Sequence, residues 1–244
     1  MNSRRDPAGA LRCFLTLPHP CGYLPEREAV TLLMDPQLVV DRHLYSQLAM
    51  RGFRRSGDSV YRPHCPDCSA CISLRVNSGA FRPNRSQRRV WRRNQDLECT
   101  LAAPSCDEEH FQLYARYLAA RHAGAGMDDP TPDSYRQFLL AQRLETVFLD
   151  CRLAGRLVCV AVLDVLDDGL SAVYTFFDPA LVQRGLGVYA ILQEISEVCR
   201  RGLDWLYLGY WIEACQRMNY KDRFRPFQIY RAGGWCDPGQ SEEG

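Results

Sequence analysis

Residues 145–177 are mostly apolar and are divided by turn residues in a way that is typical of β-strands. Three apolar runs, at 145–153, 156–166 and 169–177, are separated by short turns that contain Gly155 and Asp168-Gly169. An Asp-Gly pair between two apolar runs is a strong signal for a tight hairpin. The pattern therefore predicts a three-stranded antiparallel meander.

Segments whose apolar residues recur at helical intervals precede and follow this meander in the sequence. Phe111, Tyr114 and Leu118 recur at helical intervals after a helix start at Ser105, and this helix is expected to end in a loop at 124–126. Further helices are predicted at 134–143, 186–201 and 213–219, with strands at 204–209 and 227–231.

The first part of the chain has shorter elements. A loosely held leader is expected at 1–12, a strand at 13–17, a helix at 41–51 capped by Gly52, and strands at 59–62 and 72–76. The change of pattern near residue 104 predicts two domains, at 1–103 and 104–244.

The overall expectation is an α+β protein. Three strands, a helix opened by a glycine-containing turn, and another strand follow the order of an acyl-CoA N-acyltransferase, so such a fold is expected at 104–244, beside a smaller cysteine-containing domain at 1–103. The turn at 184–189 is either a pyrophosphate-binding turn or a tight turn before a buried helix. Tyr189 stands where the first alternative requires a small residue.

Composition excludes several classes of protein. With 46% hydrophobic and 24% charged residues among 244, the chain is an ordinary globular protein rather than a disordered or fibrous one. It has neither a membrane-spanning apolar run nor a signal peptide, so no membrane partner and a cytoplasmic location are expected.

The net charge of +1 conceals an asymmetry, because residues 1–100 carry +7 and residues 101–244 carry −6. An anionic partner such as nucleic acid is therefore expected to bind mainly to the first part. The segment 82–94 contains six arginines and no acid, and the aromatic side chain in it could stack on a base. The residues expected to contact RNA are Arg82, Arg85, Arg88, Arg89, Trp91, Arg92 and Arg93.

Twelve cysteines in a cytoplasmic chain are expected to be mostly free thiols, and isolated ones such as Cys99 and Cys151 to be small buried hydrophobes. Cys65, Cys68 and Cys71 are spaced as two successive C-x-x-C steps. Together with Cys21 they could bind zinc or an iron–sulfur cluster, or they could be reduced thiols at a bend.

Several segments together resemble the bacterial aspartate/glutamate leucyltransferases, which belong with the arginyl-tRNA–protein transferases. The resemblance covers about residues 13–235, and its motifs lie at 21–25, 52–57, 61–65, 81–94, 172–179, 208–212 and 218–221. Eukaryotic relatives have a second cysteine at the position of Leu24, so the chain is more similar to the leucyl group. The resemblance implies transfer of leucine from leucyl-tRNA to proteins with an N-terminal Asp or Glu, which marks them for N-degron degradation, and no cofactor is required for the transfer.

The reaction implied is attack of an α-amine on an ester, for which positioning and oxyanion stabilisation outweigh the need for a strong base. We expect Tyr210 to donate to the oxyanion or to the leaving oxygen, and Asp178 to orient the ammonium or accept its proton. The alternatives are that Tyr210 is a packed aromatic residue and that Asp178 starts a turn before Pro179. Lys221, the only lysine of the chain, is the foremost candidate for binding the acceptor carboxylate. The other residues expected to bind substrate are Arg54, Arg55, Tyr174 and Arg225.

Two other functions stay open at this level. The fold order also suits an acyl-CoA-dependent N-acyltransferase, which would bind coenzyme A. A non-catalytic RNA-binding module would bind charged and uncharged tRNA equally and consume neither.

Overall fold

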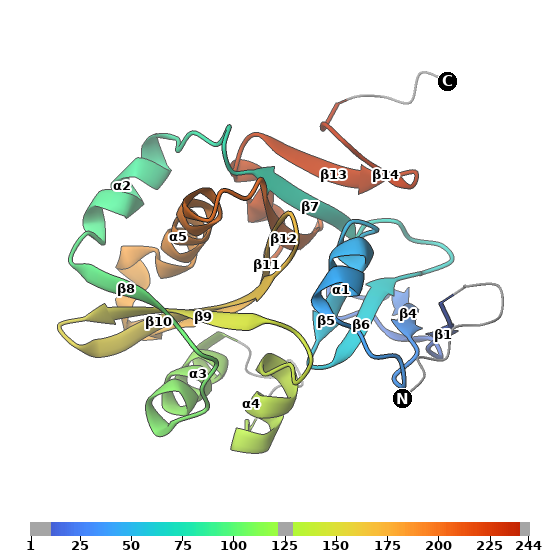
Figure 1. The fold of residues 1–244 in the computed structure, drawn as a ribbon, viewed down its shortest axis with the longest axis horizontal. Coiled ribbons are helices and arrows are strands. Elements are labelled where there is room, and N and C mark those ends of the chain that lie inside the picture. The colour runs from blue at the N-terminus through green and yellow to red at the C-terminus, as the bar shows by residue number, and fades with distance from the viewer. Residues whose placement is uncertain (1–10, 122–128, 240–244) are drawn as a thin grey trace.

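The computed structural model describes residues 11–121 and 129–239 and is built around one large mixed sheet (Figure 1). Its eight strands, in spatial order, are β14 (Gly234–Cys236), β13 (Phe227–Arg231), β7 (Ile72–Asn77), β12 (Trp205–Trp211), β11 (Gly169–Phe177), β10 (Arg156–Val165), β9 (Thr146–Leu153) and β8 (Leu97–Ala102). β8 to β11 are antiparallel, and β12 joins β11 in parallel through the helix α5 (Leu186–Arg200). The predicted meander and the α+β class are confirmed.

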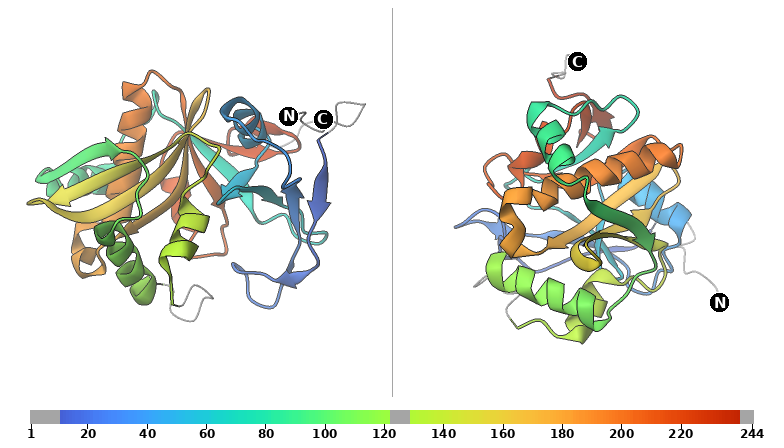
Figure 2. Two further views of the ribbon diagram at one scale, coloured as in Figure 1. Left: turned by 60° about the horizontal axis from the view of Figure 1, so that its bottom comes forward. Right: turned by 90° about the vertical axis from the view of Figure 1, so that its left-hand side faces the viewer.

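Helices cover both faces of this sheet (Figure 2). α5 and α2 (Arg85–Arg93) pack on one face, and α3 (Glu108–Arg121) and α4 (Pro132–Leu139) lie on the other. Each face has its own apolar core, with Val158, Leu163 and Ile195 in one and Leu113, Phe148 and Val160 in the other. Burial of both faces explains why β10 is an almost continuous apolar run.

A smaller sheet lies beside the large one. It contains β1 (Cys13–Leu15), β4 (Thr31–Met34), β6 (Ser59–Pro63) and β5 (Arg54–Ser56), while β2 (His19–Pro20) and β3 (Glu28–Ala29) form a separate pair. The helix α1 (Arg42–Ala49) packs with it, capped at its start by the side chain of Asp41. The expected strands at 59–62 and 72–76 and the helix at 41–51 are confirmed.

Several expectations need correction. The helix predicted at 213–219 is wrong, since the helical turns there are the 3₁₀ segment η2 (Asn219–Arg223). β8 and β14 were not predicted. The large sheet takes β7 and β8 from before residue 104, so it does not divide at that position. The loop at 124–126 and most of the leader at 1–12 lie outside the described residues.

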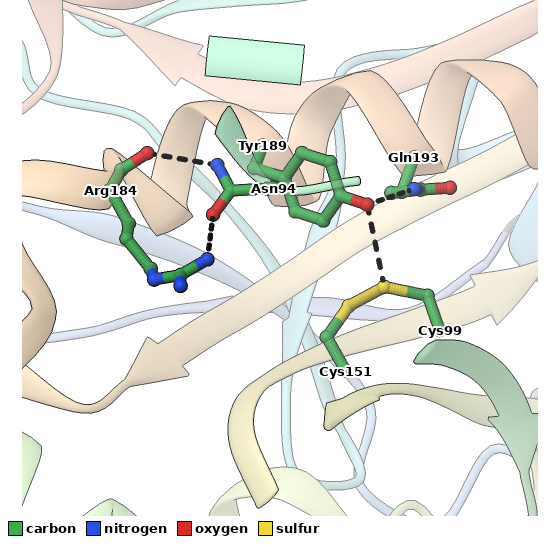
Figure 3. The surroundings of a disulfide bond; sticks show 6 residues. All are labelled: Asn94, Cys99, Cys151, Arg184, Tyr189 and Gln193. Carbon is green, nitrogen blue, oxygen red and sulfur yellow. Dashed lines mark hydrogen bonds between the residues drawn. A yellow bond between two sulfur atoms is a disulfide. The ribbon is translucent and has the colours of Figure 1, made fainter. Parts of the chain in front are cut away.

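The expectation that Cys99 and Cys151 are free thiols is also wrong, because the two form a disulfide (Figure 3). They are direct partners in the antiparallel pairing of β8 with β9, with a Cα–Cα distance of 4.1 Å. Residues 52 positions apart in the chain are thus brought together by the register of the sheet. The hydroxyl of Tyr189 on α5 lies 3.9 Å from the Cys99 sulfur.

Among residues 11–121 and 129–239, no helix combines the length and apolar character needed to cross a bilayer.

Candidate functional site

The pairing of β11 with β12 ends soon after it begins, and Arg54 lies where it ends. The two strands pair only at residues 169–171 and 205–207. The Arg54 guanidinium donates to the Ser171 hydroxyl at 2.9 Å and the Tyr207 carbonyl at 3.2 Å, and also to the Ala172 carbonyl. Arg54 therefore ties β5 of the small sheet to both strands.

Gly209 makes room for this guanidinium. Its φ of +77° is rarely adopted by other residues, and a Cβ atom there would lie 3.2 Å from the Arg54 Nε. The register of β12 against β7 also shifts here, between Tyr207 and Gly209. The glycine thus allows β12 to bend around the arginine.

Lys221 is buried beside the end of the same strand. The residue is only 8% exposed, and its ammonium group donates to the Tyr210 carbonyl at 2.7 Å. Burial, together with the positive charge of Arg54, lowers the pKa of Lys221 to about 7. The structure therefore holds the only lysine of the chain close to the protonation midpoint at neutral pH.

Glu194 on α5 completes what we call the buried charge cluster, which consists of Arg54, Lys221 and Glu194. Glu194 is fully buried, and neither carboxyl oxygen has a hydrogen-bond partner in the described part of the chain. Burial raises its pKa to about 8, although the charges of Arg54 and Lys221 act in the opposite direction. The sequence analysis missed this residue, and its only signal was an acid among apolar residues of the helix.

Arg55 does not join the cluster. Its guanidinium donates to both oxygens of Asp164, at 2.6 and 2.7 Å, and both side chains are fully buried. It also donates to the Leu139 carbonyl at 3.2 Å. Its hydrogen-bonding groups connect β5, β10 and α4, so Arg55 would have to release Asp164 before it could bind substrate as expected.

The two expected catalytic residues lie in different surroundings. The Tyr210 hydroxyl is buried and donates to the Gly52 carbonyl at 3.1 Å, next to the cysteine loop. Asp178 caps the 3₁₀ segment η1 (Pro179–Arg184) and forms an ion pair with Arg156 at 2.5 Å. Burial alone would raise the pKa of Asp178, but the hydrogen bond from Arg156 lowers it. The structure does not bring the two residues together as a catalytic pair.

The remaining expected substrate residues differ in exposure. Tyr174 lies in an aromatic cluster, with its ring centroid 5.1 Å from that of Phe138. Arg225 is exposed, and its guanidinium lies 5.1 Å from the Phe227 ring centroid. Of these two residues, Arg225 alone therefore offers an unburied positive charge.

The cysteine loop borders a cavity of about 610 Å³, lined by Cys21, Cys65, Cys68, Cys71, His64 and Tyr210, among others. Burial and the neighbouring thiols raise the pKa of Cys71 to about 12. Yet in the part of the chain that the structure describes, no three His, Cys, Asp or Glu side chains are grouped so that they could hold a metal ion. The four thiols share a cavity but do not fit a metal as arranged.

The basic segment forms the exposed helix α2. Asn84 and Gln87 form a capping box at its start, and Gln87 also donates to the Arg223 carbonyl at 3.1 Å. The six expected RNA-binding arginines are exposed, and none forms an ion pair with another described residue. Trp91 instead is half-buried, with its ring 5.6 Å from that of Tyr189. The helix therefore exposes arginines that no acidic side chain neutralises, while Trp91 packs its other side against α5.

Comparison with known proteins identifies the family. Residues 19–89 match the family model described as arginine-tRNA-protein transferase, N terminus, and residues 109–231 match its C terminus. An aspartate/glutamate leucyltransferase of Marinobacter nauticus is 49% identical over 91% of this chain and 94% of its own length. Proteins of the same name from Pseudomonas paraeruginosa and Pseudomonas putida are 49% and 48% identical, each over 92% of this chain and 96% of the relative.

Similarity to solved structures is more distant. The C-terminal domain of a putative lysylphosphatidylglycerol synthetase from Agrobacterium fabrum matches 59% of this chain and 47% of its own, at 16% identity and a TM-score of 0.45. L-PGS from Bacillus licheniformis matches 66% of this chain and 60% of its own, at 13% identity and a TM-score of 0.43. The sequence matches, by contrast, extend over both the cysteine-containing segment and the sheet with its buried charge cluster. The chain therefore belongs to the arginine-tRNA-protein transferase family.

Proposed function

We propose that this enzyme transfers leucine from leucyl-tRNA to the N-terminal Asp or Glu of acceptor proteins, which marks them for N-degron degradation. The relatives named aspartate/glutamate leucyltransferase support this choice of donor and acceptor, with identities of 48–49% over more than nine-tenths of the chain. Because aminoacyl-tRNA is made and used in the cytoplasm, the proposal places the reaction there.

The structural observation that carries the proposal is the buried charge cluster at the end of the β11–β12 pairing. An acceptor side chain that carries a carboxylate needs a positive partner shielded from water, where an ion pair is stronger than at the surface. The ammonium of Lys221 has three N–H groups, and the Tyr210 carbonyl accepts one of them. We assign Lys221 to the acceptor carboxylate, with Arg225 at the exposed side.

The chemistry requires little acid–base assistance. An α-amine with a pKa of about 8 is partly neutral at pH 7 and can attack the ester carbonyl of leucyl-tRNA directly. The amine's bond to the carbonyl carbon forms, the ester C–O bond breaks, and the ribose oxygen leaves with a proton. Arg54 acts as a positioning residue, since its hydrogen bonds connect β11 and β12 where their pairing ends. A catalytic role for Asp178 would require it to release Arg156, and one for Tyr210 would require its hydroxyl to release Gly52.

The donor tRNA is assigned to α2. Its exposed arginines can contact phosphate oxygens of the acceptor stem without first breaking ion pairs. The binding affinity should therefore fall steeply with salt concentration.

The direct test is transfer of radiolabelled leucine from leucyl-tRNA to peptides that begin with Asp, Glu or Ala, with arginyl-tRNA assayed in parallel. Labelling of only the Asp and Glu peptides by leucine is the expected result. Binding of tRNA without any labelling would favour the non-catalytic RNA-binding module. Binding of coenzyme A without binding of tRNA would favour the acyl-CoA-dependent enzyme.

A further inference from the structure

A second cavity, of about 480 Å³, lies between α2 and α5. Each helix contributes residues spaced three and four apart, which therefore share one helical face. From α2 and its end these are Arg88, Trp91, Arg92 and Gln95, and from α5 they are Leu192, Ile195, Ser196 and Cys199. The segment 78–83 closes the remaining side. The volume falls within the range of about 300–1,000 Å³ that is typical of small-molecule sites.

The inner wall of this cavity is apolar and held in place. Phe81, Leu192 and Ile195 are 8%, 5% and 4% exposed and belong to the core beneath α5. Phe81 stacks on Phe224 with a centroid distance of 6.2 Å, and Trp91 packs against a tyrosine of α5. Because core contacts fix these rings, the cavity does not depend on mobile side chains for its shape.

The outer rim is positively charged. Arg82, Arg88 and Arg92 line the cavity and are exposed, and no acidic residue of 11–121 or 129–239 lines it. Arg82 and Arg88 donate to backbone carbonyls of neighbouring residues, and none of the three forms an ion pair within the described part of the chain. The apolar wall suits a flat apolar group of a ligand, and the arginines of the rim suit an anionic group on the same molecule.

One residue that lines the cavity has a buried hydroxyl without a partner among the described residues. Ser78 lines the cavity and is 3% exposed, and its hydroxyl has no hydrogen-bond partner among the described residues. A buried hydroxyl without a partner is unfavourable by about 1–3 kcal/mol, so such groups are uncommon in a protein interior. Almost no surface of this hydroxyl is exposed, so it lies beneath the cavity wall and is not counted among the groups that contact a ligand.

We propose that this α2–α5 cavity binds an unpaired nucleotide of the donor tRNA. The base lies against Trp91 and the apolar wall, while its phosphate contacts Arg88 and Arg92. A base within a duplex is stacked and paired and cannot enter, so the cavity distinguishes single-stranded RNA from a helical stem. The inference rests on the proposed function only in naming tRNA as the source of the nucleotide.

The test fills the cavity without changing the charge of the protein. Ser196 is exposed on the α5 wall, so Ser196→Trp should fold normally and occupy the space intended for a base. Binding of a labelled short single-stranded oligoribonucleotide and of a blunt RNA duplex is measured by fluorescence anisotropy. We expect about tenfold weaker binding of the single strand, the lower part of the range for losing one base stack, and unchanged binding of the duplex.

A matched pair of arginine variants provides the control. Arg92 lines the cavity whereas Arg89 does not, and both are exposed on α2. Arg92→Ala and Arg89→Ala should weaken duplex binding equally, and Arg92→Ala alone should weaken single-strand binding further. Equal effects on both RNAs, or single-strand binding unaffected by Ser196→Trp, would overturn the cavity proposal. Wild-type leucine transfer in the same preparation separates that result from failure of the proposed function, which would show no transfer at all.

Discussion

Replacing Arg55 tests whether this residue acts in structure or in substrate binding. Its side chain is fully buried, makes two short hydrogen bonds to Asp164, and donates to the carbonyl of Leu139. Arg55→Met would remove these bonds and leave a buried carboxylate whose remaining side-chain partner is the hydroxyl of Thr146, at 2.7 Å. Leaving one member of a buried ion pair without its partner costs about 3–5 kcal/mol. We expect a loss of this size in the free energy of unfolding.

The assay is denaturation in urea, followed by circular dichroism, on Arg55→Met, Asp164→Leu and the double variant. Because the double variant contains no unpaired buried charge, it should be more stable than either single variant. Leucine transfer per folded molecule, measured well below the unfolding midpoint, should remain close to that of the wild type. A change in stability below about 1 kcal/mol, combined with a large loss of transfer, would refute the reasoning and return Arg55 to the substrate site.

Three further predictions concern other features. Lys221→Met should lower kcat/KM for Asp and Glu peptides at least about tenfold, because a charge-assisted contact of about 1.5–3 kcal/mol is lost, while tRNA binding measured by filter retention stays unchanged. Burial alone would lower the pKa of His110, but its hydrogen bonds to two aspartates raise it. Its contribution to stability should therefore be complete below the unfolded pKa of about 6.5 and be lost as pH rises through the higher folded value, and a His110→Gln variant should show a flatter stability profile between pH 6 and 8. Thiol titration of the denatured, unreduced protein should find ten free thiols among the twelve cysteines, and a count of twelve would contradict the Cys99–Cys151 disulfide.

Local patterns predicted the parts of the fold that depend on neighbouring residues. The three strands of the meander were expected because their apolar runs are joined by glycine-containing turns, and the structure confirms them. The helix α2 was not predicted, since 82–94 was identified only as a basic segment, although the capping box at Asn84 and Gln87 is a signal that lies within a few residues. The helical turns of η2 begin later than the helix predicted at 213–219. The chain first turns back after β12, so that the Trp211 indole N–H donates to the Asn219 carbonyl.

Contacts between distant residues could not be inferred from such patterns. Arg54 and Arg55 are adjacent and chemically identical, yet one donates to carbonyls of β11 and β12 and the other pairs with Asp164. Successive residues of a strand point to opposite faces, and what each face meets depends on the packing of the two sheets. Glu194 showed no signal beyond its charge, because its significance comes from neighbours on other elements.

The sequence by itself determined the α+β class, the meander, the basic segment and the family resemblance, because these depend on periodicity, residue type and motifs spread along the chain. Only the tertiary structure decided that Cys99 meets Cys151, that Asp178 and Tyr210 lie in different surroundings, and that two helical faces enclose a cavity. Strand register and sheet packing bring together residues that are far apart in the chain. A sequence pattern reflects only interactions between neighbouring residues, so it does not predict those contacts.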